Sequence, residues 1–151
     1  MPTSPPTPLK FSLLPASLPA DIPALVSVGA LAFADDPSDH AIFGSADPAA
    51  LFKWRCERFE KRVLSEDDWK RARYVKLVLD QEEGEKEVIV AYAGWWAPTE
   101  GAEKEEEKKE EGGLEAPEGT NMVLFGKFMK LIKEKEEAIL GKGWEKKWWC
   151  K

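Results

Sequence analysis

Three carboxylates and the single histidine lie close together between positions 35 and 40, and these side chains are the best suited to chemistry. Asp35, Asp36 and Asp39 precede His40. Histidine titrates near neutral pH and often serves as a general base, but a base needs a positioned partner, which a lone loop histidine does not supply. We therefore expect His40 to be a surface residue. The carboxylates could attract an amine, or they could cap helices and form turns, and both readings stay open.

Two cysteines and a tryptophan pair are the remaining candidates. Cys56 lies on the apolar stripe of a predicted helix with no histidine placed to activate it, so we expect an inert thiol. Cys150 is expected to be more exposed. The chain has no CxxC or Cys/His cluster, and we expect no metal site. Trp95 and Trp96 face opposite sides of a predicted strand, so one can join the core while the other could line a pocket.

The elements that must position these residues begin with a strand and a helix. Leu9–Leu14 alternates apolar and polar residues at first, which predicts a strand that turns at Pro15. Asp21 before Ile22-Pro23 is a helix start signal and predicts a helix over residues 21–34. Its expected inner face consists of Leu25, Gly29, Ala32 and Phe33. Residues 35–39 are expected to form a loop.

The same start signal recurs at Asp47-Pro48 and predicts a second helix. Apolar residues then recur at spacings of four, three and four, which indicates one buried face. That face consists of Phe52, Cys56, Phe59 and Val63. A hairpin follows, with strands over residues 73–79 and 88–96. Its second strand is apolar on both faces, as a central strand covered on both sides would be.

Residues 99–119 are expected to form a solvated, disordered acidic loop. They contain nine Glu and three Lys, a difference equal to the formal net charge of -6. The rest of the chain is therefore balanced, and we expect no nucleic-acid partner, since that would require a concentrated basic face. The acidic run could bind a basic partner, but such runs are usually only solubilising.

A third helix and a terminal strand complete the expected order. The helix begins near Asn121 and ends at Gly141, a usual residue after a helix C-terminus. Its expected inner face consists of Met122, Phe125, Met129, Ile132 and Ile139. Residues 143–151 hold three tryptophans in a strand-like pattern. An apolar edge of this kind needs a neighbour, so we expect a fold that is cut short or completed by another chain.

The sequence thus predicts one α+β domain over residues 9–151, after a flexible proline-rich leader at residues 1–8. The expected order is β-α-α-β-β-α-β, with a mixed, mainly antiparallel sheet and helices packed on it. A hydrophobic content of 43% is enough for one core. The N-terminus does not resemble a secretory signal, and no apolar run approaches the roughly 20 residues that span a bilayer. We expect a soluble, cytoplasmic protein with no membrane partner.

Several segments of this order resemble the first half of the GNAT superfamily of N-acetyltransferases, particularly the acetyltransferase-like proteins common in filamentous fungi. The matching segments are Leu13–Ala16, Ala20–Leu25, Ala32–Pro37, Trp54–Phe59, Tyr74–Val78, Ala91–Trp95 and Leu140–Trp149. The resemblance implies a partial GNAT-like fold and transfer of acetyl from acetyl-CoA to an amine by direct attack, with no metal. It also implies substrate-side roles for Phe33, Asp35, Asp36, Trp95 and Trp96.

The resemblance stops before the cofactor site of the family. In GNAT enzymes a Q/R-x-x-G-x-G/A loop opens a helix whose N-terminal amides hold the acetyl-CoA pyrophosphate. The nearest match here, Ala138–Gly143, has alanine in the Q/R place and follows a predicted helix. We therefore expect a truncated domain that is inactive alone. The alternative is a non-catalytic interaction module that pairs with itself or another protein through its terminal tryptophan strand, with the acidic loop as a second contact.

Overall fold

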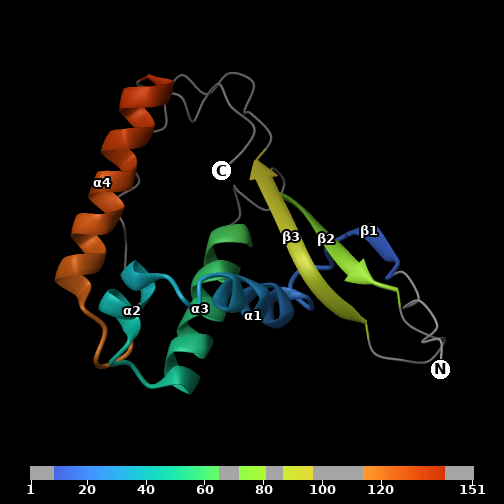
Figure 1. Cartoon of the computed structure of the whole chain (residues 1–151), viewed down its shortest axis with the longest axis horizontal. Helices are drawn as coiled ribbons and strands as arrows, with labels where there is room; N and C mark the ends of the chain where they lie inside the picture. The colour runs from blue at the N-terminus through green and yellow to red at the C-terminus, as the bar shows by residue number, and fades with distance from the viewer. Residues whose placement is uncertain (1–8, 65–71, 81–86, 97–113, 142–151) are drawn as a thin grey trace, which may run out of the picture.

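The computed structural model of this protein describes residues 9–64, 72–80, 87–96 and 114–141. Seven elements lie in these ranges (Figure 1). In chain order they are β1 (Phe11–Pro15), α1 (Ile22–Ala32), α2 (Pro37–Phe43), α3 (Pro48–Val63), β2 (Ala72–Leu79), β3 (Val88–Trp96) and α4 (Met122–Leu140). The predicted α+β class is confirmed. The observed order contains one helix more than the sequence predicted between the first and second strands.

The three described strands form an antiparallel sheet in the order β1-β2-β3. Leu13 and Leu77 are register partners in β1 and β2, and Leu77 pairs in turn with Ala91 of β3. The register shifts at the next position, which leaves Val90 as an extra residue in β3. The predicted hairpin is confirmed, but its second strand is not central among the described strands. Because β1 pairs with β2, β2 is central and β3 lies at an edge.

Helix α1 packs on the sheet through a narrower face than the sequence predicted. Ile22, Leu25 and Val26 are its buried residues. Phe33 was expected on this face but is 59% exposed, because the helix ends at Ala32 and Phe33 follows its last turn. Ala32 is exposed as well. The inner position of Leu25 is confirmed.

The predicted loop over residues 35–39 is wrong, because a short helix, α2, begins there. Asp36 is its N-cap: one carboxylate oxygen accepts from the backbone N–H of Ser38 at 2.6 Å and from that of Asp39 at 3.3 Å. Pro37 then supplies the preset backbone angle of a first helical residue. The carboxylate therefore stabilises the start of a helix, which is one of the two readings that the sequence left open.

Helix α3 begins where the sequence predicts. Asp47 caps it by accepting from the backbone N–H of Ala50 at 2.8 Å. Its buried residues are Trp54 and Val63, with Cys56 and Phe59 half-buried. Phe52, which was expected inside, is 38% exposed. The buried face is shifted because Trp54 turns toward an aromatic cluster that three helices share.

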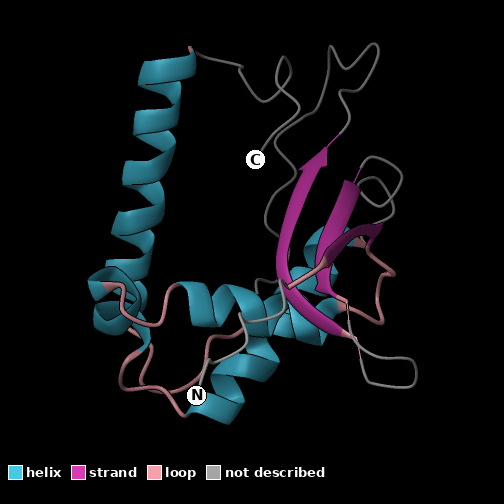
Figure 2. Ribbon diagram, turned by 45° about the vertical axis from the view of Figure 1, so that its right-hand side comes forward, coloured by secondary structure: helices cyan, strands magenta, loops and turns pink. Residues whose placement is uncertain are grey.

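Two clusters form the core of the described residues. The first joins α1, α3 and the sheet: Ile22, Val26 and Val63 are buried, with Leu18, Cys56, Phe59 and Tyr74 packed against them. The second is aromatic and joins α2, α3 and α4. Its centre is Trp54, whose ring lies 5.9 Å from Phe43 and 6.3 Å from Phe125 between centroids. The helices α1 and α3 lie on one side of the sheet, and α4 stands apart from the strands (Figure 2).

The segment before α4 contacts the helices through specific bonds. The indole N–H of Trp54 donates to the carbonyl of Leu114 at 3.3 Å, and the backbone N–H of Asn121 donates to the carbonyl of Ile42 at 2.8 Å. Gly119 has a φ of 87°, and a Cβ there would lie 2.2 Å from the Ser45 carbonyl oxygen. The last residues of the predicted acidic loop, 114–119, therefore lie against the folded body.

Helix α4 begins and ends as predicted but does not bury the predicted face. The side chain of Asn121 accepts from the backbone N–H of Leu124 at 3.0 Å, and Gly141 follows the last turn with a φ of 83°. None of its residues is buried, and Ile139 is 79% exposed. Met122 and Met129 are exposed too. The cause is that, within the described ranges, the contacts of α4 with α2 and α3 lie near its N-terminal end (Figure 1).

Several sequence predictions fall outside the described residues. They are the leader at residues 1–8, most of the acidic loop, Cys150 and the terminal strand at residues 143–151. Within the described ranges, no helix combines the length and the apolar composition that a membrane span requires.

Candidate functional site

The predicted substrate-side residues fall in two places. Phe33, Asp35 and Asp36 are near neighbours in the chain and lie in the link from α1 to α2. Trp95 lies near the end of β3. Among the described residues, no hydrogen bond, ion pair or ring contact joins Trp95 to the other three. The backbone of Trp96 belongs to β3, and its side chain is outside the described part. The structure thus keeps these residues as two groups.

The three carboxylates near the start of α2 have different roles. Asp36 caps the helix, and the backbone N–H groups of Ser38 and Asp39 hold the pKa of its carboxyl below the ordinary value. Asp39 is paired with Arg55, whose guanidinium nitrogen lies 2.7 Å from its carboxylate oxygen. Asp35 is exposed and has no hydrogen-bond or ion-pair partner among the described residues. Of the three, Asp35 is the one left to meet an external cation.

His40 lies on α2 rather than in a loop, and it is exposed as expected. Its backbone carbonyl accepts from the N–H of Gly44 at 2.9 Å. In the part of the chain that the structure describes, its ring has no hydrogen-bond partner that would orient it. A general base requires such orientation, so His40 has no arranged catalytic role in these residues.

Lys76 is the buried charged residue that the sequence reading missed. It is 6% exposed, and its ammonium lies 3.0 Å from an Asp21 carboxylate oxygen and also contacts the carboxylate of Glu87. The hydrogen bond that Lys76 donates to Glu87, together with the one that it donates to Asp21, outweighs burial and raises the pKa of Lys76. The amine therefore stays protonated at neutral pH and cannot act as a nucleophile or base. Its ion pairs with Asp21 and Glu87 link β2 to the start of α1 and to the start of β3.

The two tyrosines form an aromatic wall with Phe59 between the helices and the sheet. The ring of Phe59 lies 5.2 Å from that of Tyr74 and 6.3 Å from that of Tyr92, between centroids. Burial raises the pKa of the Tyr74 hydroxyl, which therefore keeps its proton at neutral pH. A Cβ on Gly29 would lie 3.2 Å from the Tyr92 hydroxyl oxygen, so a glycine allows α1 to approach this wall. The arrangement packs α1 and α3 against β2 and β3.

The expected inertness of Cys56 is supported by its surroundings. Burial raises the pKa of the thiol, and the nearby carboxylates of Glu57 and Glu60 raise it further. The thiolate, which is the reactive form, is therefore scarce at neutral pH. Cys56 serves as a small apolar side chain beside the first core cluster.

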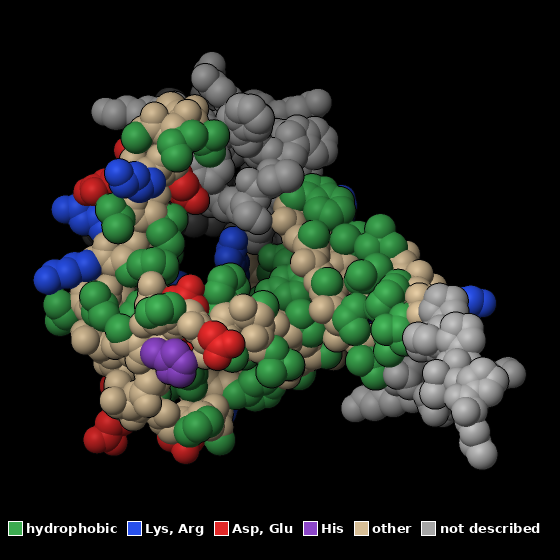
Figure 3. Space-filling view, in the orientation of Figure 1, with side chains coloured by type: hydrophobic (Ala, Val, Ile, Leu, Met, Phe, Trp, Pro, Cys, Tyr) green, Lys and Arg blue, Asp and Glu red, His purple; other side chains and the backbone are tan. Residues whose placement is uncertain are grey.

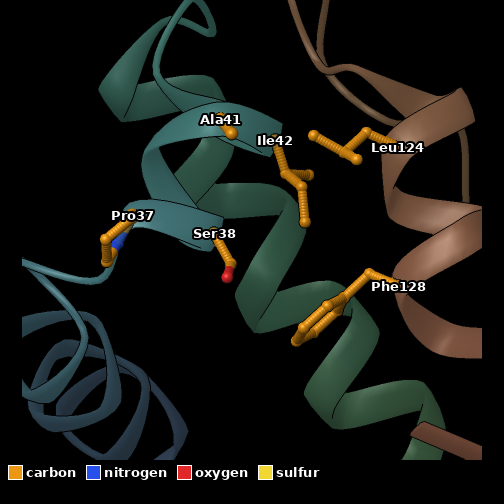
Figure 4. A pocket seen from close by; sticks show the side chains of 6 residues that line it. All are labelled: Pro37, Ser38, Ala41, Ile42, Leu124 and Phe128. Carbon is orange, nitrogen blue, oxygen red and sulfur yellow. The ribbon is translucent and has the colours of Figure 1, made fainter. Parts of the chain in front are cut away.

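A small pocket lies between α2 and α4 (Figure 4). Its volume is about 260 Å³, and Ile42, Leu124 and Phe128 point into it (Figure 4). The remaining lining residues are Pro37, Ser38 and Ala41. The Ser38 hydroxyl is the one polar side-chain group among these six, and none of them titrates. The pocket is therefore an apolar recess that does not include the predicted substrate-side residues.

The described residues do not fit the phosphate site of acetyl-CoA. The nearest match to the family's loop begins at Ala138, in the last turn of α4, and Gly141 ends that helix. The C-terminus of a helix exposes carbonyl oxygens and carries partial negative charge, whereas a pyrophosphate requires the N–H groups of an N-terminus. No step of acetyl transfer can therefore be assigned to these residues.

Neither metal ligands nor comparisons with known proteins assign a function to the described residues. No group of three or more His, Cys, Asp or Glu side chains in the described ranges is placed to hold a metal ion. No protein-family model, curated protein or solved structure matches this chain.

Proposed function

We propose that this chain carries the amine-binding side of a GNAT-type N-acetyltransferase, an enzyme that passes acetyl from acetyl-CoA to an amine. The observation that carries the proposal is the arrangement of the sheet. β1 leads into helices, two of which pack on one face of an antiparallel β1-β2-β3 sheet, and the chain then returns through the β2-β3 hairpin. This arrangement is compatible with the strand and helix order of the first half of the family.

Three of the segments that carry the resemblance lie in the helical part of the fold, which supports the proposal. Ala20–Leu25 opens α1, and Ala32–Pro37 links α1 to α2. Trp54–Phe59 lies in α3 and contributes Trp54 to one core cluster and Phe59 to the other. These residues thus have structural roles that explain their types.

Asp35 is the residue that we assign to the amine. Its carboxylate is exposed and has no described partner, and Phe33, two residues earlier, presents a largely exposed ring. A carboxylate attracts an ammonium, and an aromatic face attracts the same cation. An exposed ion pair of this kind contributes at most about 1 kcal/mol, so we expect weak binding by this group alone.

The coding sequence supplies the direct experiment. If the proposal holds, the transcript downstream of the Lys151 codon, in any frame or after an intron, encodes a Q/R-x-x-G-x-G/A stretch between a strand and a helix. Long-read sequencing of the transcript checks this. A transcript with no such stretch would remove the reason to assign acetyl transfer.

Titration with acetyl-CoA tests the cofactor side separately. Because the described residues contain no fitting phosphate loop, calorimetry should show no binding tighter than about 1 mM, which corresponds to about 4 kcal/mol. A micromolar dissociation constant would contradict this expectation, since the chain would then hold the pyrophosphate by residues that we have not assigned.

The interaction module considered in the sequence analysis remains a prediction. It depends on residues 143–151 and on the acidic run, and these lie largely outside the described residues. No described contact favours it over the acetyltransferase.

A further inference from the structure

One stripe of α4 is covered at its start and exposed beyond it. The stripe begins with Phe125, which packs in the aromatic cluster, and continues at spacings of four, three, four and three. The further members are Met129, Ile132, Glu136 and Ile139. Ile139 is 79% exposed and Met129 is exposed as well, while Ile132 and Glu136 are half-buried. Hydrophobic and charged side chains lie together along this helix in the space-filling view (Figure 3).

A carboxylate within the stripe restricts what can cover it. Glu136 follows Ile132 by four positions and precedes Ile139 by three, so the three side chains project to the same side of the helix. Glu136 has no hydrogen-bond or ion-pair partner among the described residues. A covered carboxylate is costly unless a cation pairs with it. The stripe therefore fits a partner that places one cation between two apolar groups, and it disfavours a purely apolar one.

The sequence contains a segment of this chemistry directly after the helix. Residues 142–151 hold four lysines, one glutamate and three tryptophans. Side chains alternate along an extended segment, so Trp144, Lys146 and Trp148 would share one side. Their order is apolar, cationic, apolar. The part of α4 nearest to this segment, residues 134–137, has the opposite charge balance, with three glutamates and one lysine.

We propose that residues 142–151 fold back antiparallel to α4 and cover its stripe. In this arrangement Lys146 pairs with Glu136, and the tryptophans on either side of the lysine pack on the isoleucines on either side of the glutamate. The spacings agree. The two tryptophans lie about 13 Å apart at about 3.3 Å per extended residue, and the two isoleucines lie about 10.5 Å apart at about 1.5 Å per helical residue.

The residues at the end of α4 suit such a reversal. Gly141 ends the helix with a φ of 83° and a ψ of 159°, a combination that essentially only glycine adopts. A second glycine, Gly143, follows two residues later. Because the segment is joined to the helix by so short a connection, its effective concentration at the stripe is about millimolar. A second copy or another protein with the same side chains would need a comparable concentration to displace it.

Disulfide formation in the full chain tests the proposed register. Cys150 follows Trp148 by two residues, which places it beside Met129. Cys56→Ala leaves Cys150 as the single native thiol, and Met129→Cys or Lys127→Cys is added to this background. Lys127 is exposed and lies about 160° around the helix from Met129, so it is the matched control. Under mild oxidation at low protein concentration, the disulfide within one chain should form at least about tenfold faster in the Met129→Cys variant.

Charge reversal tests the pairing of Lys146 with Glu136. Added to the Met129→Cys variant, Glu136→Lys should slow disulfide formation by up to about fivefold, because it sets two cations against each other. Lys146→Glu in the same chain should restore the rate, since the pair is then re-formed with its charges exchanged. Glu134→Lys is the control: Glu134 lies on another side of the helix, 3.8 Å from Lys130, and its reversal should leave the rate close to that of the parent.

Each other outcome overturns the proposal. Equal rates for the Met129→Cys and Lys127→Cys variants mean that the segment has no preferred face of α4. A disulfide between two chains, seen as a doubled mass on a non-reducing gel, assigns the stripe to the segment of a second copy. Circular dichroism checks folding. Should Met129→Cys unfold, alkylation of Cys150 is compared in Glu136→Lys and Glu134→Lys chains, and equal rates again refute the contact. The proposal does not depend on the proposed acetyltransferase function.

Discussion

At the scale of single residues, Lys76 departs most from what a strand pattern suggests. A lysine in an alternating strand usually faces water, yet Lys76 lies on the side that the helices cover. Two carboxylates make this burial tolerable, because a buried ammonium is costly unless it is paired and hydrogen-bonded. Asp21 lies 55 positions earlier in the chain, so no local pattern could reveal the pair. Asp21 was expected to cap α1, and its carboxylate instead accepts from the Ser17 backbone N–H at 2.6 Å.

Replacing Lys76 should therefore be costly. Lys76→Ala leaves the carboxylates of Asp21, which is 15% exposed, and Glu87, which is 42% exposed, without their cation, and we expect the free energy of unfolding to fall by about 2–3 kcal/mol. Urea unfolding followed by tryptophan fluorescence measures this. Lys130→Ala is the control, since Lys130 forms an exposed pair with Glu134 at 3.8 Å and should cost less than about 0.5 kcal/mol. Equal effects of the two changes would contradict a structural role for Lys76.

Asp21 should make stability depend on acid. Burial raises the pKa of its carboxyl, but the Ser17 N–H and Lys76 lower it more, so the folded pKa is below the ordinary value. Because its pKa is lowered in the fold, the ionised carboxyl stabilises the fold above the unfolded pKa of about 3.9. This contribution is lost as pH falls through the folded pKa. The free energy of unfolding should thus decline between about pH 5 and pH 2.

The Asp21→Asn variant should show a shallower decline, measured by urea unfolding across that range. Some slope should persist, because the pKa of Asp36 is also lowered, by the backbone N–H groups at the start of α2. Asp35→Asn, which changes an exposed carboxyl without a described partner, should leave the wild-type slope intact. An unchanged slope in Asp21→Asn would assign the acid sensitivity to other groups.

At the scale of elements, start signals were the most reliable part of the sequence. Asp47-Pro48 located the first turn of α3, and Asn121 located that of α4, since a cap and its helix are neighbours in the chain. The same signal at Asp36-Pro37 began a helix of seven residues, and the reading as a loop was wrong because so short a helix has no visible period. Buried faces were less predictable. On α3, Trp54 is buried in place of the expected Phe52, because aromatic partners from α2 and α4 determine which side of the helix is covered.

The α3 cap gives a direct test at this scale. Asp47→Ala removes the acceptor for the Ala50 N–H and should lower the free energy of unfolding by about 1 kcal/mol. Asp35→Ala, a change of the same type at a residue with no described partner, should have little effect. Thermal unfolding monitored by circular dichroism compares the two. A harmless Asp47→Ala would mean that α3 does not depend on its cap.

Two glycines form a second matched test. Gly119→Ala would place a Cβ 2.2 Å from the Ser45 carbonyl oxygen at a positive φ, so we expect a loss of about 1–3 kcal/mol. Gly126→Ala adds a methyl group to α4 with no atom within 4 Å, and it should increase helicity and gain up to about 1 kcal/mol. Circular dichroism at 222 nm with thermal unfolding distinguishes the two. A stabilising Gly119→Ala would contradict the described contact.

At the scale of the whole molecule, the sequence predicted the α+β class and the hairpin. It did not predict which strand is central or which candidate site residues come together. Apolar content on both sides of β3 suggested a central strand, yet β2 is central because β1 pairs with it. The site shows the same limit. Phe33, Asp35 and Asp36 stay near each other as chain neighbours, whereas no described contact brings Trp95 to them. Phe33, Asp35 and Asp36 are close because they are near neighbours in the chain, whereas only tertiary packing could have brought Trp95 to them.

Within the part of the chain that the structure describes, α4 contacts the other helices near its N-terminal end. Leu124, Phe125 and Phe128 contact the helices beneath, and Leu140 lies about 22 Å beyond Phe125 along the axis, at about 1.5 Å per residue. A tilt of about 10° at the aromatic cluster would then move the far end by about 4 Å, by simple geometry on that length. A spectroscopic label near Leu140 would therefore report, with amplification, on how tightly the rings of Phe43, Trp54 and Phe125 are packed.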